Sequence, residues 1–122
     1  MNQEQVKQAG LGKTGAALGY PFGPEPAVLF VEGKMFALLG GYQGKPSVSL
    51  KTDPDTAWIV RDKYPDAVFP GYHLNKRHWN SVVLDGSVPK EELLDMLEES
   101  YRLVVAKLPK AVRERLRAQE GA

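Results

Sequence analysis

Residues 27–51 read AVLFVEGKMFALLGGYQGKPSVSLK, and this stretch sets the architecture of the chain. Two apolar runs, 27–31 and 35–39, flank the short glycine-containing turn 32–34, a pattern that predicts a β-hairpin. A second turn covers 40–46. Residues 47–51 then alternate polar and apolar side chains, as a strand with one buried face does. We therefore expect three consecutive antiparallel strands here.

The segment before this region starts with a helical pattern. It covers Gln3 to Leu18 and contains Gly10, Gly12 and Gly15. Because each glycine costs roughly 1 kcal/mol relative to alanine inside a helix, we expect a frayed or broken helix. Residues 19–24, rich in glycine and proline, are expected to form a turn-rich connector.

A helix is also expected directly after the three strands. Asp53 is suited to the N-cap and Pro54 to the first helical position. The helix should end near Tyr64, because Pro65 disfavours helical geometry in the residue before it. We expect Trp58, which lies on this helix, to be in the core.

Two shorter apolar segments and a long helix follow. Residues 67–69 predict a strand or an extended lead-in to a loop, and residues 79–84 predict a strand. Pro89 then opens the clearest helix, which Pro109 ends. Its apolar side chains recur at steps of three and four residues and form one stripe: Leu93, Leu97, Tyr101, Val104, Val105 and Leu108.

The expected order of elements is therefore α-β-β-β-α-β-β-α. Mostly antiparallel strands with helices on one face are typical of an α+β two-layer sandwich. The length of 122 residues favours one domain over 1–122. We expect its core at about 20–109, with 110–122 as a basic C-terminal tail or short helix.

Composition excludes several classes of protein. The formal net charge is only +1, which argues against a nonspecific coat of positive charge, and there is no cysteine for disulfides or thiolate sites. No apolar run approaches the roughly 18–20 residues of a membrane span. The polar N-terminus lacks the apolar centre of a secretory signal. We expect a cytoplasmic protein that does not contact a membrane.

The stretch most relevant to function is PGYHLNKRHWN, residues 70–80. It holds both histidines, an adjacent Lys-Arg pair, two aromatics and two amides, with no acid among them. Its Pro-Gly start marks a turn, so part of it should be a loop. Such a cluster can contact phosphates and stack on bases. The predicted nucleic-acid-binding residues are Lys76, Arg77, Tyr72, His73, Asn75, His78, Asn80 and Lys51.

Other chemistries have weaker support in the sequence. Residues 12–14, Gly-Lys-Thr, look like the end of a phosphate-binding loop, but Lys7 stands where the motif needs a glycine, and no buried strand precedes it. His73 and His78 have no third metal ligand close by in sequence. No nucleophile elbow and no poised pair of carboxylates is present. We expect no enzymatic activity, no metal and no cofactor.

Five segments carry a resemblance to a known family: YPFGPE (20–25), GKMFAL (33–38), LKTDP (50–54), the stretch 70–80, and SY with LVVAKLP (100–101 and 103–109). Together they are similar to the MmcQ/YjbR family of small bacterial proteins. The resemblance implies a two-layer α-β(3)-α-β(2)-α fold like that of secretion-chaperone-like domains. It also implies DNA binding through a double-wing arrangement of β-hairpins.

DNA binding is therefore our leading hypothesis, with the turn 32–34 as one wing. Glu32 in that turn would oppose the approach of DNA. A second hypothesis is a protein-interaction module, as a homodimer or with another protein, that uses the sheet or the long helix. A third is a small-molecule site beneath the loop at 72–79. Trp79 is suited either to anchoring this loop on the sheet or to serving as a platform on which a ligand ring stacks.

Overall fold

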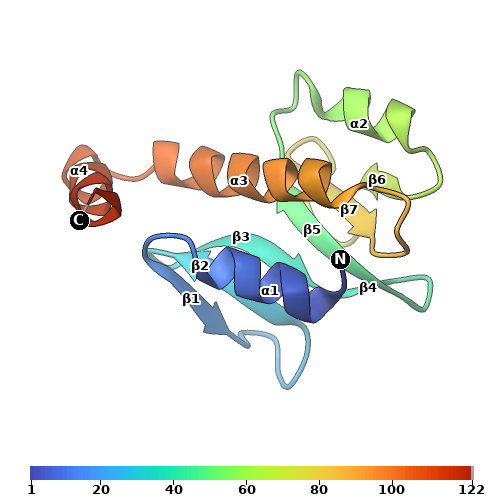
Figure 1. Ribbon diagram of the computed structural model, residues 1–122, viewed down its shortest axis with the longest axis horizontal. Coiled ribbons are helices and arrows are strands. Elements are labelled where there is room, and N and C mark those ends of the chain that lie inside the picture. Colours follow the sequence, from blue (N-terminus) through green and yellow to red (C-terminus); the bar gives the residue numbers. More distant parts are fainter. Residues whose placement is uncertain (122) are drawn as a thin grey trace.

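The computed structural model describes residues 1–121 (Figure 1). Residue 122, the last of the expected C-terminal tail, lies outside the described residues. The elements in chain order are α1 (Gln3–Leu11), β1 (Ala16–Gly19), β2 (Ala27–Val31), β3 (Lys34–Leu39), β4 (Gly41–Tyr42), β5 (Lys45–Lys51), α2 (Ala57–Lys63), β6 (Val68–Pro70), β7 (Trp79–Val83), α3 (Lys90–Ala106) and α4 (Lys110–Glu120).

The strands form one twisted sheet in the order β1-β2-β3-β5-β7-β6, and β4 adds a short pairing to β5. Every pairing among the described residues is antiparallel. The predicted hairpin is present as β2 and β3, where Val31 pairs with Lys34 across the turn. The predicted strands β5, β6 and β7 are present as well. The α+β class expected from the sequence is confirmed.

One face of the sheet is covered by helices. α1 and α3 contact each other and cross β2, β3 and β5, while α2 lies over β6 and β7 (Figure 1). The apolar stripe predicted on α3 lies in the core: Leu93, Leu97, Tyr101 and Val104 are buried against strand residues such as Phe36 and Leu50. The opposite face, called the open face below, carries Val28, Leu38, Ser47, Ser49 and Ser81.

The N-terminal segment differs from the expectation. The helix ends at Leu11, and residues 16–19 form β1, which pairs with β2. Alanine and glycine have little intrinsic preference for strands, so residues 16–19 carry no local strand signal. The exposed edge of β2 supplies the hydrogen-bonding partner that orders them.

The helix α2 begins later than predicted, at Ala57 rather than Pro54. Asp53 accepts a hydrogen bond from the Asp55 N–H, but Thr56 has φ −121° and interrupts helical geometry. Trp58 is 61% exposed, so its predicted place in the core is wrong. The inward stripe of this short helix consists of Ala57 with the half-buried Val60, Arg61 and Tyr64, and Trp58 lies outside that stripe.

The basic C-terminal segment is a helix and not a loose tail. Leu116 of α4 is buried, and it packs near Val31 and the turn at Gly15. Arg115 forms an ion pair with Glu32 in the β2–β3 turn. Arg102 of α3 forms ion pairs with Glu98 and with Glu120 of α4. These contacts attach α4 to the domain.

Candidate functional site

Residues 71–78 connect β6 to β7 and are called the β6–β7 loop. The loop folds back over the open face, since the Tyr72 N–H donates to Ser81 Oγ at 2.9 Å. Ser81 Oγ in turn lies 2.7 Å from Ser49 Oγ on the neighbouring strand. Buried hydroxyls on two strands therefore hold the start of the loop against the sheet.

The loop needs glycine at position 71. The Gly71 N–H donates to the Trp79 carbonyl at 2.8 Å. A Cβ at position 71 would lie 2.7 Å from Trp79 Cβ and 3.3 Å from Leu74 Cβ. A larger residue would push the two arms of the hairpin apart, so glycine permits this close approach.

Arg61 of α2 holds the other arm of the loop. Its Nε donates to Asn80 Oδ1 at 2.5 Å, and its Nη2 donates to the Lys76 carbonyl at 2.5 Å. Asn80 Nδ2 donates to the Ala57 carbonyl at 3.4 Å. Burial lowers the pKa of Arg61. Sequence reasoning missed this role, although the step from Ala57 to Arg61 placed Arg61 on the inward stripe of α2.

Most of the predicted binding residues in the loop face solvent. Tyr72 is 43% exposed, and His73, Asn75, Lys76 and Arg77 are exposed too. Lys76 Nζ donates to the Gly71 carbonyl at 3.0 Å. Within residues 1–121, neither Lys76 nor Arg77 forms an ion pair with a carboxylate. Both charges of the pair are therefore available to an anion.

The remaining predicted residues lie deeper. Asn80 is 1% exposed, and its amide forms hydrogen bonds with Arg61 and with the Ala57 carbonyl of α2. The Asn80 side chain therefore stabilises the fold and does not face a ligand. His78 is half-buried, and its carbonyl accepts from the Thr52 N–H at 2.8 Å. Lys51 is half-buried at the end of β5, where burial, and secondarily the charge of Lys107, lowers its pKa.

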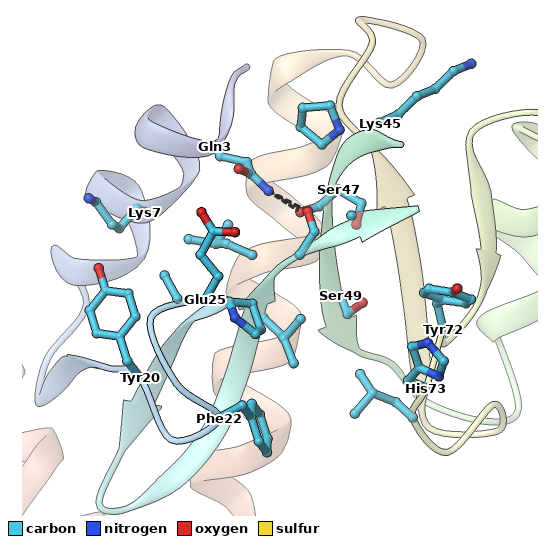
Figure 2. A pocket seen from close by; sticks show the side chains of 18 of the residues that line it. Gln3, Lys7, Tyr20, Phe22, Glu25, Lys45, Ser47, Ser49, Tyr72 and His73 are labelled. Carbon is cyan, nitrogen blue, oxygen red and sulfur yellow. Dashed lines mark hydrogen bonds between the residues drawn. The ribbon is translucent and has the colours of Figure 1, made fainter. Parts of the chain in front are cut away.

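A groove of about 920 Å³ opens beside the loop, between the open face and the start of α1. Figure 2 shows its walls: the segment 20–26, the N-terminal half of α1, the strand β5, and residues 72–74 of the β6–β7 loop. Two motifs quoted for the family resemblance, 20–25 and 70–80, thus meet at one site. Local sequence patterns do not indicate that these motifs meet, because their meeting depends on the order of strands in the sheet.

The groove is lined with exposed rings and balanced charges. Tyr20 and Phe22 are 51% and 65% exposed on one wall, and Tyr72 lies on the other. The charged lining residues are Glu4, Lys7, Glu25 and Lys45. Lys7 pairs with Glu4 at 2.7 Å, and this hydrogen bond lowers the pKa of Glu4.

The described residues hold no group of three or more side chains that could bind a metal ion. Among the helices described, none combines the length and the apolar character needed to cross a membrane.

Comparison with known proteins places the chain among proteins of similar size. The model of the YjbR family matches residues 11–103, more than half of the chain. The uncharacterized protein YbdF of Escherichia coli O157:H7 is 37% identical over 114 residues, 93% of this chain and 93% of the relative. The uncharacterized protein YjbR of Escherichia coli K12 is 41% identical over 86 residues, 70% of this chain and 72% of the relative.

Solved structures agree with this relationship. The crystal structure of a Deinococcus radiodurans protein with the domain DUF419 has a TM-score of 0.86 and 36% identity, covering 94% of this chain and 87% of that chain. A crystal structure of a Pseudomonas syringae protein has a TM-score of 0.71 and 27% identity, covering 84% of this chain and 98% of that chain. With the family model spanning both motifs that line the groove, this protein belongs to the YjbR family.

Proposed function

We propose that this protein binds DNA through the β6–β7 loop, with Lys76 and Arg77 on the phosphates. The observation that carries the proposal is that both cations are exposed and lack an ion pair within residues 1–121. Contacts of this kind supply most of the affinity of proteins for nucleic acid backbones. Tyr72 and His73 are exposed beside them and can stack or donate hydrogen bonds. Binding to DNA is consistent with the cytoplasmic location expected from the sequence.

The β2–β3 turn also supports the proposal. Ala37 pairs with Leu50, and Lys51 pairs with Trp79, so this turn and the start of β7 lie at the same end of the sheet. Glu32, which would oppose DNA in this turn, forms an ion pair with Arg115. Its negative charge is therefore offset by the fold. Two hairpin turns at one end of a sheet suit a double-wing contact.

The test is the salt dependence of DNA binding. Replacing Lys76→Ala and Arg77→Ala together should lower affinity and reduce the slope of log K against log salt concentration by up to about 2, because each phosphate contact contributes about 0.9 on duplex DNA. Fluorescence anisotropy with a labelled duplex over a salt series measures this slope.

The matched control is Lys90→Ala with Arg117→Ala. It removes one lysine and one arginine, exposed and without an ion pair within residues 1–121, from α3 and α4, outside the loop. This control should keep the parent slope. The proposal fails if the loop variant binds DNA like the parent across the series, or if both double variants lose the same slope.

A further inference from the structure

The exposed rings at the groove have no explanation in the fold itself. Phe22 is 65% exposed and stacks on no other ring among the described residues. Tyr20 is exposed on the same wall. An apolar ring in water contributes nothing to the stability of a core. Exposed rings that converge on a groove are the arrangement that stacking ligands require.

Tyr72, on the opposite wall, packs against two other rings and is still 43% exposed. Its ring meets Tyr42 edge-on, with centroids 5.3 Å apart, and Tyr42 stacks on Phe69 at 4.4 Å. His73 has φ +61°, in the left-handed region that histidine tolerates better than most residues, and its ring lies 4.0 Å from that of Tyr72. The Tyr72 ring is therefore positioned before any ligand binds, which reduces the entropic cost of stacking on it.

Charges divide the site into two parts. Inside the groove, the formal charges of Lys7 and Lys45 balance those of Glu4 and Glu25. The unpaired cations Lys76 and Arg77 follow Tyr72 by only a few residues in the same loop. A neutral, ring-lined groove suits the flat uncharged face of a base, whereas the cations suit phosphates.

We infer that the DNA bound by this site has unpaired bases, which stack in the groove on Phe22 and Tyr72 while Lys76 and Arg77 hold the backbone. This inference rests on the proposed function. In a perfect duplex the base faces are hidden within the stack, and exposing them requires unpairing. A duplex can reach the cations of the loop but leaves the groove empty.

The experiment compares three labelled DNAs of one sequence: a single strand, a perfect duplex, and a duplex with a central unpaired bubble. The single strand and the bubble should bind the parent protein more tightly than the perfect duplex does. Phe22→Ala should weaken single-strand binding by at least about fivefold, since one lost stacking contact accounts for this much. The same variant should bind the perfect duplex like the parent.

The matched control is Trp58→Ala, which removes a ring of similar exposure, 61%, from α2 outside the groove. It should leave binding to all three DNAs unchanged. Both variants alter exposed side chains, and circular dichroism verifies that each one folds.

Three outcomes overturn the inference. If the perfect duplex binds as tightly as the single strand and Phe22→Ala matches the parent, while Lys76→Ala with Arg77→Ala still loses binding, the groove does not hold bases and the proposed function stands. If Phe22→Ala and Trp58→Ala weaken binding equally, the effect is nonspecific. If no DNA binds the parent protein, the proposed function and this inference both fail.

Discussion

At the scale of single residues, the motif 70–80 divides into residues that face solvent and residues that build the loop. Lys76 and Arg77 are exposed and form no ion pair within residues 1–121, whereas Asn80 is buried and bonded to Arg61. The sequence marks all of these residues as polar and cannot separate the two groups. Arg61 lies outside the motif, yet its side chain donates a hydrogen bond to Asn80 Oδ1. This bond commits Asn80 to the fold, because a buried amide requires a hydrogen-bond partner.

Arg61→Ala should therefore destabilise the protein by about 1–3 kcal/mol, since the buried Asn80 amide oxygen loses its donor. Urea unfolding at neutral pH measures the change in free energy. Arg77→Ala is the matched control, because this exposed arginine has no hydrogen bond from its side chain within residues 1–121 and should change stability by less than about 0.5 kcal/mol. Equal stability of the Arg61→Ala variant and the parent would contradict the role assigned to Arg61.

At the scale of elements, α2 and α3 are linked by Tyr64 and Glu92. The Tyr64 hydroxyl donates to the Glu92 carboxylate, which Lys63 also approaches at 3.1 Å. The hydrogen bond from Tyr64 lowers the pKa of Glu92 below 4.5, and the same bond raises the pKa of Tyr64 above 10.0. Both shifts require a charged Glu92 and a neutral Tyr64.

The stabilisation by this pair should therefore be complete between about pH 5 and pH 9. A depressed carboxyl pKa means that the contribution is lost as the pH falls below 4.5 through the folded-state value. A raised tyrosine pKa means that it is lost as the pH rises above 10.0. Tyr64→Phe should lower the urea midpoint at pH 7, and this deficit should shrink progressively as the pH falls below 4.5.

Tyr20→Phe is the control for this prediction. The Tyr20 hydroxyl is exposed and has no hydrogen bond among the described residues, so its removal should leave the midpoint unchanged at both values of pH. A deficit of Tyr64→Phe that is the same at pH 3 and pH 7 would show that the bond to Glu92 is not the cause.

At the scale of the whole molecule, the large exposed apolar side chains of residues 1–121 lie in three places, one of which is Tyr72 in the β6–β7 loop. Leu18, Tyr20 and Phe22 lie beside β1 at one edge of the sheet. Trp58 and Ile59 lie on α2, over the strands of the other edge. A stable homodimer requires one continuous interface, with roughly 800 Å² buried on each partner. None of these three places, each with one to three side chains, suggests such a surface.

We predict a monomer, and the homodimer considered from the sequence is the alternative that a mass measurement decides. Light scattering over a range of protein concentrations should give the mass of one chain throughout. A species of twice that mass would contradict the expectation. If Trp58→Lys abolished that species, the interface would be assigned to α2.

Local patterns alone determined the α+β class, the β2–β3 hairpin, the strand β5 and the helix α3. Their signals come from neighbouring residues: alternation in 47–51, a helical stripe from Leu93 to Leu108, and a glycine turn at 32–34. Local patterns did not predict β1, which forms because residues 16–19 pair with the edge of β2. They also placed Trp58 wrongly, because its exposure depends on which face of α2 packs against the sheet.

The location of the exposed cations could also be predicted from the sequence, because a run of polar residues after Pro-Gly is a local signal. The groove could not be predicted. Its walls come from segments far apart in the chain, and only the strand order β1-β2-β3-β5-β7-β6 and the packing of α1 on the sheet bring them together. Local propensity determines which elements form, whereas long-range pairing and burial determine which side chains meet.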